Sequence, residues 1–127
     1  TDPCVILDVG HNPHAAVVLA QNVKDLGCRG KTLAVFGMLA DKDMIDVVKI
    51  MSEVIDEWFI TGLPGPRGAT AQALHRVMLE AGVSSSKITV CDGVDAAFEA
   101  AKHRAAITDT IVVFGSFVTV TAALPLV

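Results

Sequence analysis

The octet Asp8-Val9-Gly10-His11-Asn12-Pro13-His14-Ala15 follows a short apolar run at residues 4–7 and precedes a segment with helical periodicity. This order predicts a strand, a polar loop and a helix that begins at the proline, since proline is favoured in the first helical turn. In open α/β sheets, ligands bind in loops at the carboxyl ends of strands. We therefore expect a ligand site in this loop, where Asp8, His11 and Asn12 bring a carboxylate, an imidazole and an amide together.

The same alternation continues along the chain. Short apolar runs that are typical of strands occupy residues 4–7, 32–36, 58–61, 88–90 and 111–114. Apolar residues between them recur at helical spacing, and further helices are expected over about 43–54 and 117–124. Thr70 and Asp92 are the expected N-caps of the helices that follow them, whereas Gly27 and Gly82 match glycines that end helices. The pattern predicts one α/β domain over residues 1–127, a Rossmann-like, open, mostly parallel sheet of five or six strands with helices on both faces.

Composition narrows the class of protein. The chain has 127 residues, is 52% hydrophobic and carries a net charge of −4, which argues against nucleic acid as a partner. No apolar run reaches about 18 residues, so no membrane span is expected. The three cysteines are odd in number and form no C-x-x-C pair, which favours buried or incidental thiols in a reducing cytoplasm. Because the chain begins with Thr1 instead of Met, we expect a piece of a larger protein.

Polar side chains also follow the other predicted strands. Lys42, Arg67 and Ser116 come after the second, third and fifth strands, so they are expected at the same edge as the first loop. Together they suit a ligand with carboxylate and phosphate groups, and a guanidinium in the Pro/Gly-rich loop can form two parallel bonds to a carboxylate. Structural alternatives stay open: Lys42 as a solvated lysine, Arg67 as a surface arginine and Ser116 as a helix cap.

The residues of the first loop have structural alternatives as well. Asp8 can brace its loop or cap the helix, and His11 can be a turn residue. His11 and His14 lie three residues apart, but no third ligand is evident, so a metal site is not expected. Residues 27–32 do not form a P-loop, because the glycine spacing fails and the segment leads into a strand. No G-x-G-x-x-G motif occurs.

Four stretches resemble one family. Residues 8–13 are similar to the D-x-A-H-N-P loop of folylpolyglutamate synthases, and three further stretches match that family in the correct order. They are residues 35–43 (VFGMLADKD), 63–69 (LPGPRGA) and 113–120 (VFGSFVTV). The resemblance spans nearly the whole chain and is strongest to the bacterial bifunctional dihydrofolate synthase/folylpolyglutamate synthases.

This resemblance implies the C-terminal domain of a Mur-type, ATP-dependent amide ligase. Such enzymes activate a carboxylate of dihydropteroate or folylpolyglutamate as an acyl phosphate, which the amine of L-glutamate attacks. The P-loop, the magnesium ligands and most of the folate pocket of the family lie on an N-terminal ATP-binding domain, which is the implied partner. The isolated chain is accordingly expected to be inactive, and the ligase is expected to be a cytoplasmic monomer that uses ATP and Mg²⁺.

The resemblance also implies roles for site residues. Asp8 and Asn12 would contact ATP, and His11 would lie near the transferred phosphate and act in catalysis. The residues implied to recognise glutamate carboxylates are Lys42, Arg67 and Ser116.

Two positions depart from the family pattern. Gly10 replaces a common alanine, which is expected to loosen the loop, and Val118 replaces a frequent histidine, so that position is left out of the site. The alternatives are a Mur-type ligase for another amino acid and a Rossmann-like binding module without catalysis.

Overall fold

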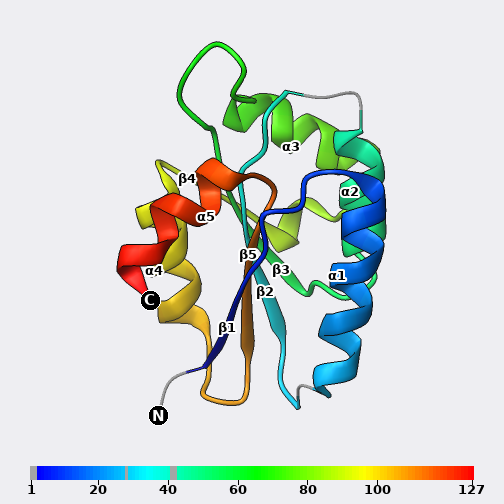
Figure 1. The fold of residues 1–127 in the computed structure, drawn as a ribbon, viewed down its shortest axis with the longest axis vertical. Coiled ribbons are helices and arrows are strands. Elements are labelled where there is room, and N and C mark those ends of the chain that lie inside the picture. Colours follow the sequence, from blue (N-terminus) through cyan, green and yellow to red (C-terminus); the bar gives the residue numbers. More distant parts are fainter. Residues whose placement is uncertain (1–2, 28, 41–42) are drawn as a thin grey trace.

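A computed structural model gives the fold and describes residues 3–27, 29–40 and 43–127. Strands and helices alternate along the chain (Figure 1). In chain order the elements are β1 (Cys4–Leu7), α1 (Pro13–Leu26), β2 (Thr32–Phe36), α2 (Met44–Met51), β3 (Glu57–Thr61), α3 (Ala71–Glu80), the 3-10 helix η1 (Ser85–Lys87), β4 (Ile88–Cys91), α4 (Val94–Arg104), β5 (Thr110–Phe114), α5 (Phe117–Ala123) and the 3-10 helix η2 (Leu124–Leu126).

The five described strands form a single sheet in the order β1-β5-β2-β3-β4, and each neighbouring pair is parallel. Ala34 of β2 stands opposite both Val112 of β5 and Trp58 of β3. Every residue of β2 and β5 is buried, which explains why these strands are continuous apolar runs instead of alternating ones. The predicted open parallel sheet is confirmed.

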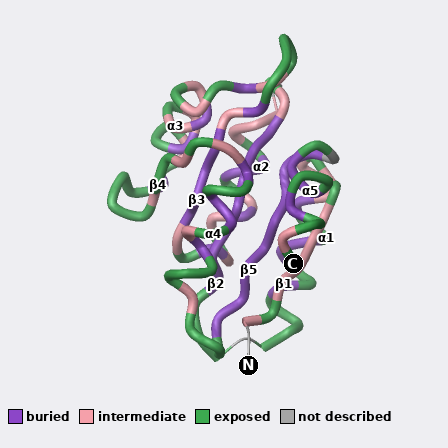
Figure 2. The backbone as a smooth tube through the Cα atoms, turned by 90° about the vertical axis from the view of Figure 1, so that its left-hand side faces the viewer, coloured by how far each residue is buried: buried purple, intermediate pink, exposed green. Residues whose placement is uncertain are grey.

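Helices cover both faces of the sheet, as predicted. Figure 1 shows α1, α2 and α3 on one side of the strands and α4 and α5 on the other. On the first face, the ring of Phe36 packs against Trp58 and Phe114 at centroid distances of 5.5 and 4.8 Å. On the second face, Phe98 of α4 is the largest fully buried side chain. Figure 2 shows burial along β2, β3 and β5, whereas the edge strands β1 and β4 are intermediate or exposed.

The helix ends follow local sequence signals, with one exception. Pro13 is in the first turn of α1, and Gly27 ends that helix in the left-handed conformation with φ of 63°. The Thr70 hydroxyl caps α3, as predicted, by accepting from the N–H of Ala73. The N-cap of α4 is Gly93, so the prediction of Asp92 was wrong. Gly93 has φ of 101°, which an aspartate rarely adopts, and its N–H donates to the Thr61 hydroxyl at 2.8 Å.

No helix in the described part of the chain has the length and apolar character that crossing a membrane requires.

Candidate functional site

The carboxyl edge of the sheet contains a change of chain direction. The chain leaves β1 and β2 toward the face covered by α1 and α2, whereas it leaves β5, which lies between them, toward α5 on the opposite face. In open α/β sheets, ligands bind at a reversal of this kind, at the carboxyl ends of the strands. The loops after β1, β2 and β5 lie at the same edge of the sheet, as the sequence predicted.

The β1–α1 loop is held by its own polar side chains. The N–H of Asp8 donates to the carbonyl of Val113 in β5 at 3.0 Å, and its carboxylate oxygen Oδ1 accepts from the N–H of Gly10 at 2.7 Å. The Oδ1 atom of Asn12 accepts from the N–H of Ala15 at 2.8 Å and thereby caps α1. Asp8 thus braces the loop, and Asn12 is the helix cap.

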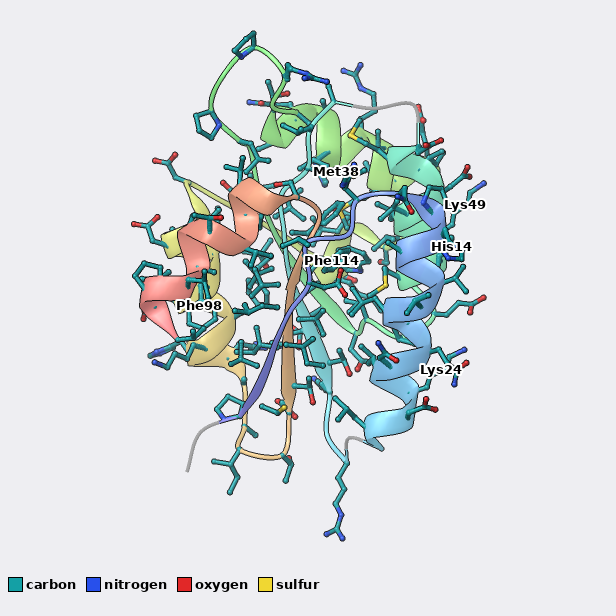
Figure 3. All side chains as sticks on the ribbon, in the orientation of Figure 1. His14, Lys24, Met38, Lys49, Phe98 and Phe114 are labelled. Carbon is teal, nitrogen blue, oxygen red and sulfur yellow. The ribbon has the colours of Figure 1, made fainter. Side chains whose placement is uncertain are left out.

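His11 presents its imidazole at this loop. Its side chain is exposed and makes no hydrogen bond with the part of the chain that the structure describes. His14 is also exposed, and Figure 3 shows it in the first turns of α1, toward the carboxyl edge, whereas Lys24 lies toward the far end of that helix. The His11 ring is therefore open to solvent.

Gly10 allows a close approach between the loop and α1. A Cβ atom at this position would lie 2.5 Å from the Cβ of Ala15 and 2.9 Å from Oδ1 of Asp8. A side chain here would push the loop away from the helix. In this loop conformation, the alanine that is common in the family would require a shift of the loop or of α1.

The loops after β2 and β3 pair with each other. The N–H of Ala69 donates to the carbonyl of Met38 at 3.0 Å, and the N–H of Ala40 donates to the carbonyl of Arg67 at 2.7 Å. An antiparallel bridge between Leu39 and Gly68 completes this pairing. The backbone of Arg67 is thereby fixed beside the β2–α2 loop, while its side chain is exposed.

Lys42, the other predicted glutamate contact with a positive charge, lies outside the described residues.

The β5–α5 loop joins the same assembly through buried hydroxyls. Ser116 is 3% exposed and caps α5, because its Oγ accepts from the N–H of Thr119 at 3.1 Å. The Thr119 hydroxyl lies 2.9 Å from Ser116 Oγ and donates to the carbonyl of Gly37 at 2.7 Å. Sequence reasoning missed Thr119, because its contact with Gly37 joins residues 82 positions apart and leaves no local signal. Val118, at the departure from the family pattern, is exposed.

Gly115 brings the β5–α5 loop against the β2–α2 loop. Its φ is 113°, and a Cβ atom added to it would overlap with the carbonyl oxygen of Gly37 and lie 2.9 Å from the ring of Phe36. Met38, which follows in the β2–α2 loop, is buried and lies just above Phe114 in the view of Figure 3. The three loops after β2, β3 and β5 therefore form one packed unit.

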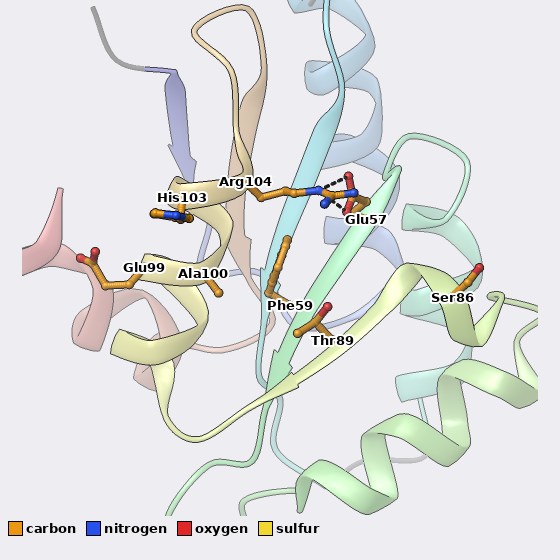
Figure 4. Close-up of a pocket in the computed structure, with 8 residues that line it drawn as sticks. All are labelled: Glu57, Phe59, Ser86, Thr89, Glu99, Ala100, His103 and Arg104. Carbon is orange, nitrogen blue, oxygen red and sulfur yellow. Dashed lines mark hydrogen bonds and ion pairs between the residues drawn. The ribbon is translucent and has the colours of Figure 1, made fainter.

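Two of the hollows in the described structure are lined in part by polar side chains. One, of about 670 Å³, is between the carboxyl ends of β3 and β4, where burial raises the pKa of the Cys91 thiol. The other, of about 850 Å³, is between α4 and the opposite end of β3, where Glu57 pairs with Arg104 (Figure 4). Glu57 also pairs with Lys31. Within the described residues, no three His, Cys, Asp or Glu side chains gather in a way that would hold a metal ion.

Comparison with known sequences identifies relatives over nearly the whole chain. The profile of the family described as Mur ligase, glutamate ligase domain, matches residues 1–117. The dihydrofolate synthase/folylpolyglutamate synthase of Escherichia coli (strain K12) is 44% identical over 118 residues, which cover 93% of this chain and 26% of that protein. Its namesake from Haemophilus influenzae is 40% identical, with coverage of 94% and 28%. The chain thus spans about a quarter of the length of these curated relatives.

Solved structures agree with this relationship. A bifunctional folylpolyglutamate synthase/dihydrofolate synthase with Mn, AMPPNP and L-glutamate bound has a TM-score of 0.87 and 38% identity, covering 98% of this chain and 29% of that one. Escherichia coli FolC in complex with ADP has a TM-score of 0.86 and 40% identity, covering 96% and 28%. The fold described above is therefore that of the corresponding part of these enzymes.

Proposed function

Because this chain belongs to the Mur ligase family through its glutamate ligase domain, we propose that it is the glutamate-binding domain of an ATP-dependent amide ligase. The ligase adds L-glutamate to dihydropteroate, to folylpolyglutamate or to both. The observation that carries the proposal is the likeness over 98% of the chain to an enzyme solved with AMPPNP and L-glutamate. The carboxyl edge of the sheet supports it, because the loops that carry the predicted site residues lie there.

The proposed roles divide between the loops. On the β1–α1 loop, Asp8 and Asn12 contact the nucleotide, and His11 acts on the transferred phosphoryl group. The exposed imidazole of His11 supports this role, and the bond from Gly10 to Asp8 keeps the loop in one shape. A braced loop favours catalysis because it holds a reacting group in place before the substrate arrives.

The glutamate pocket is proposed to include Lys42, Arg67 and Ser116. The fixed backbone of Arg67 supports its role, because a guanidinium on an anchored loop loses little freedom when it binds a carboxylate. Arg67 is exposed and so remains accessible to the ligand.

Most contacts to ATP and to the divalent cation, which we propose to be Mg²⁺, belong in this proposal to a separate ATP-binding domain of the same polypeptide. ATP supplies the phosphoryl group that activates the substrate carboxylate. The present chain binds the incoming glutamate, excludes water from the closed site and orients the phosphoryl group. We further propose that residues 1–127 form one domain of a monomeric, cytoplasmic enzyme.

The test is an Arg67→Lys substitution in the full-length ligase. A charged hydrogen bond is worth roughly 1.5–3 kcal/mol, so the KM for glutamate should rise at least about tenfold. The KM for ATP should stay nearly constant, because a pure binding contact to one substrate affects that substrate alone. Steady-state kinetics of ADP release, with dihydropteroate or folate as acceptor, measures both constants.

Arg29→Lys is the matched control, since Arg29 is exposed just before β2 at the opposite edge of the sheet. A normal glutamate KM in the Arg67 variant would remove Arg67 from the pocket. ADP release from the wild-type ligase that does not depend on glutamate would refute the proposed function itself.

A further inference from the structure

The buried hydroxyl of Thr119 contacts both the β5–α5 loop and the β2–α2 loop. The residue is completely buried, so its side chain has no access to a ligand. A threonine hydroxyl has one proton, and the bond to the Gly37 carbonyl uses it. The 2.9 Å contact with Ser116 must therefore run in the other direction, with the Ser116 hydroxyl as donor and Thr119 Oγ1 as acceptor.

This direction accounts for the Ser116 hydroxyl as well. Its proton goes to Thr119, and its oxygen accepts from the N–H of Thr119. In this arrangement Ser116 has no proton left to donate to a glutamate carboxylate. Its contribution to the site is therefore made through the position of the loop, and that position depends on Thr119.

From Gly37, the β2–α2 loop is linked in turn to the β3–α3 loop, which carries Arg67. The next residue, Met38, accepts through its carbonyl from Ala69, and two residues further Ala40 donates to the carbonyl of Arg67. Hydrogen bonds thus join the Ser116 hydroxyl to Thr119 and Thr119 to Gly37. The backbone of the β2–α2 loop continues from Gly37, and its own hydrogen bonds join it to the loop that carries Arg67. The span from Gly37 to Thr119 is the long-range link in this set.

Gly37 is packed so closely that its hydrogen bond with Thr119 can set the distance between the β2–α2 loop and α5. A Cβ atom on Gly37 would lie 3.1 Å from Thr119 Oγ1 and 2.9 Å from Cδ2 of Leu63. The β2–α2 loop is therefore pressed between α5 and the start of the β3–α3 loop, with no slack on either side.

We propose that Thr119 is a positioning residue for glutamate binding, whose buried hydroxyl sets the separation between the Ser116 loop and the Arg67 loop. The proposal rests on the proposed function, because it concerns the same pocket. Thr119 touches neither substrate nor nucleotide, so its removal should change the affinity for glutamate without a matching change for ATP.

The experiment compares three Thr119 variants in the full-length ligase. Thr119→Val keeps the shape but removes the hydroxyl, and the KM for glutamate should rise by about tenfold, the loss expected for one displaced binding contact. Thr119→Ser keeps the hydroxyl and should restore most of the affinity. Thr119→Cys offers only a weak S–H donor and should give an intermediate KM, and it carries the test if the valine variant does not fold.

Thr110→Val is the matched control, because Thr110 is a buried threonine at the opposite end of β5. It should leave both KM values unchanged. A melting temperature recorded for every variant separates loss of stability from loss of affinity. A Thr119→Val enzyme that melts earlier but keeps its glutamate KM would overturn the positioning role.

A double-mutant cycle with Arg67→Lys tests whether Thr119 affects glutamate binding through the Arg67 loop. If Thr119 acts through the Arg67 loop, its substitution should have a smaller effect on the glutamate KM when Arg67 is already lysine. Fully additive effects would overturn the proposed route. Failure of the proposed function is distinguishable, since the wild-type ligase would then show no glutamate-dependent ADP release.

Discussion

Substitution of Gly115 by alanine tests the packing of the site loops directly. Gly115 has φ of 113°, a backbone conformation that L residues rarely adopt and that costs roughly 1–3 kcal/mol. The added methyl group would also overlap with the Gly37 carbonyl and press on the Phe36 ring at 2.9 Å. Overpacking of this kind costs about 1–3 kcal/mol. The free energy of unfolding should therefore fall by about 2–6 kcal/mol in total.

A matched substitution separates the two contributions. Gly82 also has a positive φ, 94°, but no atom lies within 4 Å of the place where its Cβ would be. Gly82→Ala should therefore suffer the backbone cost alone. The difference between the two variants then measures the contact between the β5–α5 and β2–α2 loops.

Urea denaturation of the purified chain, followed by circular dichroism and extrapolated to water, gives both free energies. Natural domains are stable by about 5–15 kcal/mol, so a loss in the upper part of the expected range would leave much of the Gly115 variant unfolded without denaturant. If Gly115→Ala were no more costly than Gly82→Ala, the two loops would not be in tight contact, and the reasoning would fail.

Two further predictions concern the β1–α1 loop. His11→Ala in the full-length ligase should lower kcat by about 10²–10⁴, the range for a positioned acid or base, and unchanged turnover in steady-state assays would make His11 a turn residue only. Asn12→Ala should destabilise the chain by about 1 kcal/mol because α1 loses its cap to Ala15, whereas Asn12→Asp should retain stability; equal denaturation midpoints for all three proteins would contradict the cap.

The strands were predictable because each is a short apolar run bounded by polar residues. Their observed limits differ from the predicted ones by one residue at most, as at Glu57 and Thr110, where a polar or charged residue still takes part in the ladder. Local signals also gave the positions of Pro13 and Thr70. The Asp92 cap was wrong because the next residue, Gly93, can adopt a positive φ and donate to Thr61 in a neighbouring strand.

For the proposed site, the sequence predicted only that its loops share one edge of the sheet. Parallel strands bring their carboxyl ends to one edge, so the loops with Asp8 and Arg67 had to lie there. The pairing of the two loops after β2 and β3, and the bond from Thr119 to Gly37, join segments far apart in sequence. No periodicity or local propensity encodes such contacts, because they depend on how closely the loops approach after the sheet has formed.

The place of β5 between β1 and β2 has a consequence for how the chain acquires its fold. Among the described strands β1 pairs with β5 alone, so its hydrogen bonds cannot form until β5 has been synthesised. In the register of this pair, Cys4 stands opposite Thr110. During synthesis, β2, β3 and β4 emerge consecutively and can associate early, while β1 stays an unpaired apolar segment. Pairings between distant segments slow folding, and an exposed strand invites association with other chains until it is covered. Arrival of β5 between β1 and β2 would then complete the sheet and, in the same step, bring together the loops at its carboxyl edge.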